Sequence, residues 1–281
     1  MGVIVITGTS TGIGLATALH FARRGEQVYA TMRDLERGGA LRAAVAQEDL
    51  PVTLLQLDVT DTASVQRAIG EVLADTGYID VLINNAGIAV GGLLEEADEA
   101  MLRSGFETNV FGPLRTIQAV LPGMRARGQG TIVNVTSIGG RCILLPGAGY
   151  YHATKYAMEA LSEVLALEVA AYGIRVIIVE PGVIETPMIA PVRTMFAEKP
   201  PAPLATVFEI YNRRGEDPLL VARTIERALS DPEPRLRYLA GPDAEAWAVA
   251  RQRTTDEAWL DFVRAMGEDG FLTRFIADFA G

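Results

Sequence analysis

The fold of this chain is decided near its start by the stretch Val3-Ile4-Val5-Ile6-Thr7-Gly8-Thr9-Ser10-Thr11-Gly12-Ile13-Gly14. Its four apolar β-branched residues in a row are typical of a strand buried in a parallel sheet, and a helical pattern follows the glycines. Glycines between a strand and a helix permit a tight turn, let the backbone approach a pyrophosphate and aim a helix N-terminus at it. The stretch therefore predicts a dinucleotide site with residues 8–14 as cofactor contacts, although its glycines are spaced Gly-x-x-x-Gly-x-Gly rather than Gly-x-Gly-x-x-Gly.

Further short apolar runs, separated by helical patterns, follow along the chain. We predict strands at 27–31, 52–57, 81–83, 131–136, 174–179 and 236–240, and helices at 36–47, 63–74, 96–127, 153–172, 218–229 and 244–279. Strands that alternate with helices predict an α/β fold with a Rossmann-type, doubly wound parallel sheet. A length of 281 residues suits one domain, with a core at 1–190 and a substrate lid and helical extension at 191–281. Pro113 and Pro122 are expected to break or kink the long helix that contains Asn109.

The composition argues against several classes of function. A formal net charge of −10 without a long basic cluster disfavours binding to nucleic acid or anionic lipid. Cys142 is the only cysteine, which excludes a disulfide framework and a cysteine-based zinc site, and two histidines are too few for a His-rich metal centre. No apolar run approaches the ~20 residues of a membrane span, and the first one is too short for a signal peptide. We therefore expect a soluble, cytoplasmic protein without a resident metal.

Candidate ligand-binding residues stand where the predicted strands end, because open α/β sheets bind ligands at the carboxyl ends of their strands. After the second strand comes Arg33, and an arginine at this place accommodates the 2′-phosphate of NADP(H). Asp34, one position further, is an alternative ligand for the ribose hydroxyls, and Arg33 is alternatively a solvated loop charge. The site therefore favours NADP(H), with NAD(H) possible. The other strand-end candidates are Asp58, Val59, Asn84, Asn85, Ala86, Gly87, Pro181 and Gly182.

A second informative stretch runs from Ser137 to Lys155 and ends in Tyr151-His152-Ala153-Thr154-Lys155. On a helix, four-residue spacing puts Tyr151 and Lys155 on one face, one above the other. A phenol keeps its proton until about pH 10, and a unit charge ~4 Å away at an effective dielectric of ~20 is worth roughly 4 kcal/mol, or about three pKa units as an upper bound. We therefore predict that the Lys155 ammonium lowers the pKa of Tyr151 into a range useful for acid–base work. The plainer alternative is an ordinary solvated pair.

Taken in order, these residues resemble the short-chain dehydrogenase/reductase family over about residues 1–190. The motifs are Thr7-Gly8-x-x-x-Gly12-x-Gly14, Asp58-Val59, Asn84-Asn85-Ala86-Gly87, Asn109, Ser137, Tyr151-x-x-x-Lys155 and Pro181-Gly182. Residues 28–35 are also similar to the branch that holds hydroxysteroid and retinol dehydrogenases. The resemblance implies hydride transfer between a nicotinamide and an alcohol or ketone. It implies a cofactor lined by Gly8, Thr9, Ser10, Thr11, Gly12, Ile13, Gly14, Asp58, Val59, Asn85, Ala86, Gly87, Pro181, Gly182 and Thr186.

The resemblance also implies an active-site tetrad. Tyr151 would give or take the substrate proton, and Ser137 would hydrogen-bond the substrate oxygen. Lys155 would lower the pKa of Tyr151 and hold the nicotinamide ribose. Asn109 would bind a water that links Lys155 to solvent. The family also implies a homodimer or homotetramer, paired through the long helices around Asn109 and Tyr151.

One spacing departs from the family pattern. Ser137 lies 14 positions before Tyr151, one more than the family has. Tyr150 would restore the count, but it is five residues before Lys155 and would point from a different face of the helix. We therefore keep Tyr151 and expect the extra residue in the loop 141–146, where it alters the substrate wall.

The C-terminal third carries no chemically distinctive motif. Prolines gather between 187 and 203, which predicts a loop or lid, and aromatic residues follow between 247 and 279. These aromatic side chains suit core packing, the roof of an apolar substrate pocket or a subunit contact. We predict an NADP(H)-dependent oxidoreductase for a bulky apolar alcohol or ketone, such as a steroid, a retinoid or an aromatic ketone. The alternatives are an NAD(H)-preferring dehydrogenase of the same type and a non-catalytic dinucleotide-binding sensor.

Overall fold

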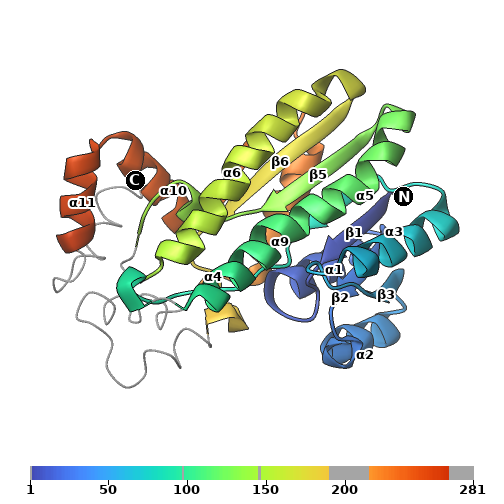
Figure 1. The fold of residues 1–281 in the computed structure, drawn as a ribbon. Coiled ribbons are helices and arrows are strands. Elements are labelled where there is room, and N and C mark those ends of the chain that lie inside the picture. Colours follow the sequence, from blue (N-terminus) through green and yellow to red (C-terminus); the bar gives the residue numbers. More distant parts are fainter. Residues whose placement is uncertain (1, 97, 145–146, 190–214, 266–281) are drawn as a thin grey trace.

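A seven-stranded parallel sheet with helices on both faces forms the body of the protein (Figure 1). The structure is a computed structural model, and it describes residues 2–96, 98–144, 147–189 and 215–265. Neighbouring strands pair in parallel, in the order β3-β2-β1-β4-β5-β6-β7. The predicted doubly wound α/β fold is confirmed.

The elements follow the alternation that the sequence predicts. The strands are β1 (Val3–Thr7), β2 (Gln27–Met32), β3 (Val52–Gln56), β4 (Val81–Asn84), β5 (Gly130–Val135), β6 (Ile174–Pro181) and β7 (Arg237–Ala240). The α-helices are α1 (Gly12–Arg23), α2 (Gly39–Glu48), α3 (Thr62–Thr76), α4 (Glu99–Phe106), α5 (Gly112–Arg127), α6 (Gly149–Val169), α9 (Pro218–Ser230), α10 (Pro242–Gln252) and α11 (Asp256–Ala265). Because β1 pairs with β2 on one side and β4 on the other, the strand order reverses there, which is the place where open α/β sheets bind ligands.

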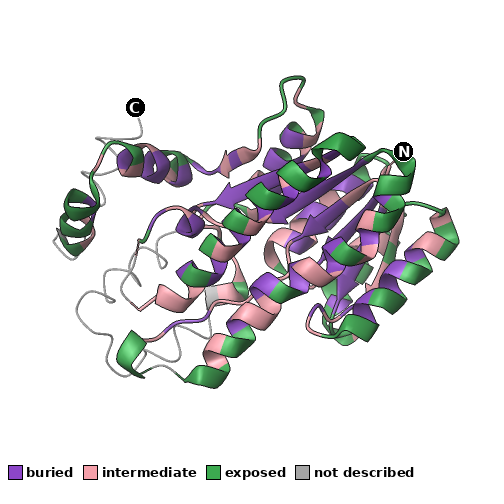
Figure 2. Cartoon of the chain, turned by 45° about the horizontal axis from the view of Figure 1, so that its top comes forward, coloured by how far each residue is buried: buried purple, intermediate pink, exposed green. Residues whose placement is uncertain are grey.

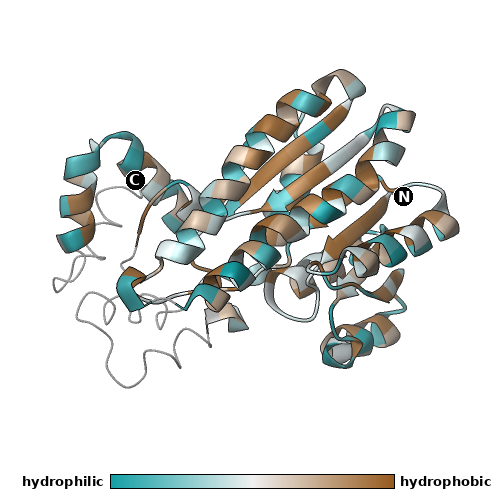
Figure 3. Ribbon diagram, in the orientation of Figure 1, coloured by the Kyte–Doolittle hydropathy of each residue, from teal (hydrophilic) through white to brown (hydrophobic). Residues whose placement is uncertain are grey.

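Both faces of the sheet are buried, and this explains the unbroken apolar run at its centre. Val3 and Val5 join a core cluster with residues of α3, α5 and α6, whereas Ile4 and Ile6 join a second cluster with residues of α1, α2 and α9. The central strands are accordingly mostly purple in Figure 2 and largely brown in Figure 3. A strand covered on both faces needs apolar residues at every position, not at alternate ones.

The predicted helix over 96–127 is interrupted, but Pro122 does not interrupt it. α4 passes into a π-helical turn, Glu107–Phe111, which contains Asn109, and α5 follows directly. Pro113 lies in the first turn of α5, where its missing N–H costs nothing. Pro122 lies inside α5, so it does not break the helix, and the alternative of a kink stays a prediction. Instead, the widened turn marks the irregular point of this segment, and such turns are frequent at functional sites.

The aromatic residues of the C-terminal part that the structure describes pack as a core. The predicted helix over 244–279 consists there of two helices, α10 and α11. Trp247 and Trp259 are buried with their ring centroids 6.1 Å apart, and their cluster includes Ile138 and Cys142 beside β5. Phe271, Phe275 and Phe279 lie outside the described residues, as does most of the proline-rich segment predicted to form a lid. None of the described helices combines the length and the apolar character needed to cross a membrane.

Candidate active site

The predicted cofactor residues lie at one edge of the sheet, where the carboxyl ends of the strands meet. Residues 8–14 join β1 to α1, Arg33 follows β2, residues 58–59 follow β3, residues 85–87 follow β4, and residues 181–182 end β6. Thr186 lies against the β1–α1 turn, because a Cβ on Gly12 would come within 3.0 Å of Thr186 Cγ2. The structure thus brings residues that are far apart in sequence to a single edge.

Two glycines of the β1–α1 turn stand where no side chain fits. Gly8 has a φ of +72°, and a Cβ there would lie 2.7 Å from Ala86 Cα. A Cβ on Gly14 would lie 2.2 Å from the Gly8 carbonyl oxygen and 2.5 Å from Asn85 Nδ2. Asn85 Nδ2 donates to the carbonyl oxygens of Thr7 (2.9 Å) and Gly8 (3.0 Å). Asn85 therefore holds the turn from the neighbouring strand, whatever else it contacts.

The start of α1 fits the phosphates of a dinucleotide. Its N-cap, Thr11, makes no side-chain cap hydrogen bond, and the first turn has no acidic residue. The N–H groups of a helix start and its macrodipole both favour an anion there. The residues present therefore fit a pyrophosphate at this turn.

The two candidate ligands at the end of β2, Arg33 and Asp34, differ in their contacts with the rest of the chain. The Arg33 side chain is exposed and forms no hydrogen bond or ion pair with the described part of the chain. Asp34 is already engaged, because its Oδ1 accepts a hydrogen bond from Glu36 N at 3.0 Å and caps the following turn. Asp58 is engaged in the same way, with Oδ1 accepting from Thr60 N (2.9 Å) and Thr60 Oγ1 (2.8 Å).

Three of the four predicted catalytic residues gather where β5 meets α6. α6 begins at Gly149, so Tyr151 and Lys155 lie in its first two turns. Ser137 lies two residues after Val135, the last residue of β5. The Ser137 side chain lies close enough to the Tyr151 phenol to lower its pKa as a hydrogen-bonding partner, and Lys155 Nζ lies 5.7 Å from the centroid of the Tyr151 ring. Tyr150 points its hydroxyl elsewhere, to the Leu94 carbonyl oxygen at 3.2 Å, which favours Tyr151 as the phenol of the site.

The pKa values at this pair differ from the prediction. Burial raises the pKa of Tyr151, and the hydrogen bond from Ser137 only partly opposes it. Burial also lowers the pKa of Lys155 to about 8, against the effect of the Glu159 charge. Lys155 Nζ donates to the Val135 carbonyl oxygen at 3.2 Å. The predicted lowering of the Tyr151 pKa is therefore not found in this structure, because desolvation dominates and the ammonium bonds to the backbone of β5.

Asn109 is buried in the π-helical turn with its side chain fully occupied by protein partners. Its Oδ1 accepts from Ile88 N at 2.8 Å, and its Nδ2 donates to Ile88 O at 2.9 Å and to Thr154 Oγ1 at 3.1 Å. Since Thr154 precedes Lys155 on α6, Asn109 ties the segment after β4 to the helix of the candidate catalytic pair. The water that the family resemblance implies at Asn109 stays a prediction.

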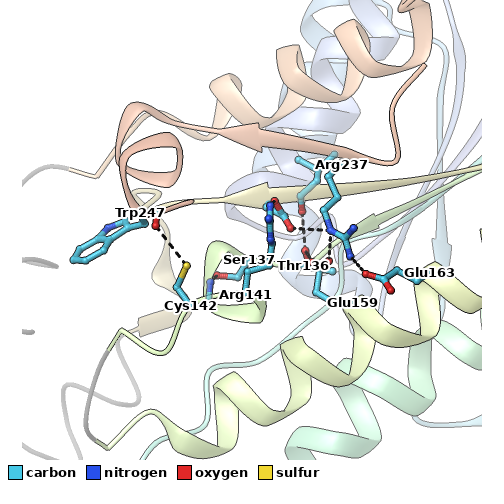
Figure 4. A network of polar contacts seen from close by, with 11 residues as sticks. Thr136, Ser137, Arg141, Cys142, Glu159, Glu163, Arg237 and Trp247 are labelled. Carbon is cyan, nitrogen blue, oxygen red and sulfur yellow. Dashed lines mark hydrogen bonds and ion pairs between the residues drawn. The ribbon is translucent and has the colours of Figure 1, made fainter. Parts of the chain in front are cut away.

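A network of buried charges that the sequence analysis missed lies behind Ser137 (Figure 4). Glu159, one turn beyond Lys155 on α6, accepts from Thr136 Oγ1 at 2.6 Å and from Arg237 Nε at 2.9 Å. Glu180 on β6 is fully buried and lies 3.3 Å from both Arg141 Nη1 and Arg237 Nε. The spacing of Glu159 from Lys155 was a visible signal, as was a single carboxylate inside the apolar strand at 174–181.

The Glu180 carboxyl should make the stability of the protein fall as the pH rises. Burial and the Glu159 charge raise the pKa of Glu180 to about 7, from 4.5, despite the two arginines. A carboxyl whose pKa is higher in the folded state binds its proton more tightly there, so its ionisation costs stability as the pH rises through this window. We expect the thermal midpoint to fall more between about pH 5 and pH 8 in the wild type than in Glu180→Gln. The control is Glu163→Gln, which removes an exposed carboxylate that pairs with Arg237, and it should keep the wild-type pH dependence. An equal fall of the thermal midpoint with pH in all three proteins would contradict the prediction.

The cysteine and the histidines do not form a metal or redox centre in the described residues. Cys142 is buried, and burial raises its pKa to about 12. His20 lies on α1 with its Nε2 2.8 Å from Glu226 Oε2 of α9, a structural contact. No group of three or more His, Cys, Asp or Glu side chains that could hold a metal ion occurs in the described part of the chain.

Comparison with known proteins places the chain among related enzymes. A family model described as short chain dehydrogenase matches residues 2–196. Human 17-beta-hydroxysteroid dehydrogenase type 1 is 35% identical over 294 residues, which cover 96% of this chain and 86% of that protein. Bovine (Bos taurus) retinol dehydrogenase 8 is 36% identical over 256 residues, covering 83% and 80%. A 3-ketodihydrosphingosine reductase of Bacteroides thetaiotaomicron is 41% identical over 181 residues, but these cover only 64% of this chain and 63% of that protein.

Solved structures agree with this grouping. A short-chain dehydrogenase from Streptomyces avermitilis is 36% identical, with a TM-score of 0.78 over 99% of this chain and 97% of that one. ElxO, solved with NADP bound, is 28% identical, with a TM-score of 0.72 over 85% and 96%. The predicted likeness to the hydroxysteroid and retinol dehydrogenase branch is confirmed by the relatives. This chain is an oxidoreductase that belongs to the short-chain dehydrogenase/reductase family, whose members use a nicotinamide dinucleotide.

Proposed function

We propose that this protein transfers hydride between NADP(H) and a secondary alcohol or ketone, with Tyr151 as the group that gives or takes the proton. The observation that carries the proposal is that Ser137 and the buried Lys155 both stand beside the Tyr151 phenol, Ser137 as the partner that lowers its pKa and Lys155 with Nζ 5.7 Å from the ring centroid. A serine hydroxyl and a phenol that share a hydrogen bond can together hold one substrate oxygen. The β1–α1 turn at the same edge of the sheet supports a dinucleotide next to this pair.

Proton handling follows from the same groups. When bound, the nicotinamide supplies or accepts the hydride at the substrate carbon. A raised pKa keeps the Tyr151 phenol protonated at neutral pH, which suits donation to the oxygen of a ketone during reduction. During oxidation Tyr151 must accept a proton, and the Ser137 side chain, which opposes the effect of burial on the Tyr151 pKa, favours the ionised form that can do so. Asn109, which ties α6 to the segment after β4, supports the placement of Lys155.

Arg33 is the residue proposed to select NADP(H) over NAD(H). Arg33→Ala should weaken NADPH binding by about 10- to 100-fold, the loss of one or two charge-assisted hydrogen bonds, and should leave NADH binding nearly unchanged. Dissociation constants from fluorescence titration with both cofactors measure the difference. Arg67→Ala, an exposed arginine on α3, is the control and should change neither constant. Equal losses for NADPH and NADH in Arg33→Ala would remove Arg33 from the 2′-phosphate site and favour the NAD(H) alternative.

A bulky, apolar substrate is supported by the names of the relatives, which refer to a hydroxysteroid, to retinol and to 3-ketodihydrosphingosine. A panel of steroid, retinoid, long-chain and aromatic alcohols and ketones, assayed with both cofactors, tests the proposal. Turnover of at least one apolar carbonyl or alcohol with a nicotinamide is the expected result. Tight NADPH binding without turnover of any compound would favour the non-catalytic sensor instead.

The proposal includes a cytoplasmic homodimer or homotetramer, formed through α5 and α6. Val164 and Leu167 on α6 have exposed fractions of 51% and 81%, and Phe111 just before α5 has 48%. Apolar side chains gathered on such helices favour a subunit contact. A molar mass of one chain by light scattering would exclude the oligomer. The division into a core at 1–190 and a substrate lid and helical extension at 191–281 stays part of the proposal, and residues 190–214 and 266–281 lie outside the described residues.

A further inference from the structure

The loop that follows Ser137 controls where that hydroxyl points. Ser137 caps a short 3-10 turn, Ile138–Gly140, in which Gly139 N donates to Ser137 Oγ at 3.0 Å and Gly140 N donates to Ser137 O at 2.8 Å. Residues 138–144, here called the loop after Ser137, begin with this turn and contact α6 through His152, the neighbour of Tyr151. A side chain that holds this loop against α6 therefore also holds Ser137 relative to Tyr151.

His152, the neighbour of Tyr151 on α6, contacts this loop at two points. Its Nδ1 lies 2.7 Å from the Gly139 carbonyl oxygen, and Leu144 N donates to its Nε2 at 3.3 Å. A backbone carbonyl only accepts and a backbone N–H only donates, so the ring must carry its proton on Nδ1 and be neutral. The ring is buried, with an exposed fraction of 3%, and a Cβ on Gly139 would come within 3.1 Å of it.

We propose that His152 is a positioning residue, whose neutral imidazole ties Gly139 and Leu144 to α6 and thereby sets Ser137 and the substrate wall relative to Tyr151. The inference rests on the proposed function for its effect on turnover, but not for the contacts themselves. Three further polar contacts hold the same loop in the described part of the chain: from Trp259 Nε1 to the Ile143 carbonyl oxygen (2.8 Å), from Cys142 Sγ to the Trp247 carbonyl oxygen (3.7 Å) and from Arg141 to Glu180. These three come from other elements, whereas the hydrogen bonds of His152 tie the loop to the helix of Tyr151.

A protonated His152 could not keep both contacts. Its second N–H would face the N–H of Leu144, and two donors repel where one hydrogen bond had been. Burial lowers the pKa of His152, so the ring stays neutral at pH 7 and the conflict arises only in acid. The titratable side chains on the elements packed around the ring are Tyr150, Tyr151, Lys155, Tyr156, Glu159, Glu163 and Glu168 on α6 and Arg141 and Cys142 in the loop. None of them forms a hydrogen bond or ion pair with the ring in the described part of the chain.

The tautomer can be measured without any assay of activity. The chain has only two histidines, so ¹⁵N-histidine labelling of the untagged protein gives two rings, and His20→Gln assigns them. The expected result at pH 7 is a neutral ring with its proton on Nδ1 for His152, titrating below the ordinary range. A proton on Nε2, or a charged ring at pH 7, would overturn the proposal.

Three variants then separate positioning from general packing. His152→Asn keeps a donor near the place of Nδ1, His152→Gln keeps an acceptor near the place of Nε2, and His152→Ala keeps neither. Since one hydrogen bond is worth about 1 kcal/mol net, His152→Ala should raise KM or lower kcat for a ketone by about 5- to 30-fold, with Asn and Gln intermediate and the NADPH dissociation constant unchanged. In acid, the wild type should lose substrate affinity reversibly, whereas His152→Gln, which cannot be protonated there, should not.

The outcomes distinguish this inference from the proposed function. Unchanged kinetics in a folded His152→Ala would overturn the positioning role, as would loss of NADPH binding in parallel with turnover. No turnover by the wild type on any alcohol or ketone would overturn the proposed function, and the tautomer measurement would then decide the positioning inference alone.

Discussion

Tyr151→Phe is expected to lower turnover by about 10³-fold while NADPH binds nearly as before, because general acid–base catalysis contributes about 10²- to 10⁴-fold. The substitution removes only the hydroxyl whose pKa the Ser137 side chain lowers. The ring stays in place on α6, so the fold and the nearby Lys155 should be unaffected. Steady-state kcat/KM with an apolar ketone, together with the NADPH dissociation constant, measures the effect.

Tyr150→Phe is the matched control, since it removes the neighbouring phenol on the same helix. Its hydroxyl donates to the Leu94 carbonyl oxygen, away from Ser137. We expect turnover close to that of the wild type. Full activity in Tyr151→Phe, or an equal loss in both variants, would discard Tyr151 as the acid–base group.

Gly14→Ala should have the second largest effect, because the new methyl group would be forced into the backbone of the β1–α1 turn. It would lie 2.2 Å from the Gly8 carbonyl oxygen and 2.5 Å from Asn85 Nδ2, which itself holds the turn. Overpacking of this kind costs about 1–3 kcal/mol of stability. The turn must shift to relieve this clash, and the shift should break hydrogen bonds from the turn to the phosphates. NADPH affinity should therefore fall by about 10- to 100-fold. Thermal unfolding with and without NADPH reports both losses, since a bound ligand raises the midpoint according to its affinity.

Gly70→Ala gives the matched control for a glycine inside a helix. Gly70 lies in α3 and has open space where a Cβ would stand. Alanine at an exposed helix position is favoured over glycine by up to about 1 kcal/mol, so this variant should be as stable as the wild type or more stable. A Gly14→Ala protein with normal stability and normal NADPH binding would show that the turn can move freely and would refute the close-packed arrangement.

Much of the fold could be predicted because its signals are local. Residues 3–6 form an unbroken apolar run because β1 is covered on both faces, and the glycines after it mark a turn into a helix. The spacing of Tyr151 and Lys155 places them on one helix regardless of where that helix packs. No break occurs at Pro122, because proline weakens a helix without always ending it and packing against the sheet outweighs that cost, while the alternative of a kink stays a prediction.

The charges around the site could not be predicted in the same way. Arg237 contacts Glu159, which lies 78 positions earlier, and no local pattern joins the two residues. The direction of the Tyr151 pKa also escaped prediction, because the spacing of Tyr151 and Lys155 says nothing about desolvation. The role of His152 could not be predicted either, because its two hydrogen-bond partners, Leu144 N and the Gly139 carbonyl oxygen, are backbone atoms of a loop whose path the sequence does not specify.

The amino-acid sequence by itself determined the succession of strands and helices along the chain, the dinucleotide turn, and the placement of Tyr151 and Lys155 on one helix. These features depend on residues that are neighbours in the chain. Only the tertiary structure decided which groups are buried together, what charge each of them favours and which backbone atoms hold Ser137. The physical reason is that burial and hydrogen bonding depend on distances between separate elements. Those distances are set by how α6, β5 and β6 pack together, and the pattern of any one of these segments does not contain them.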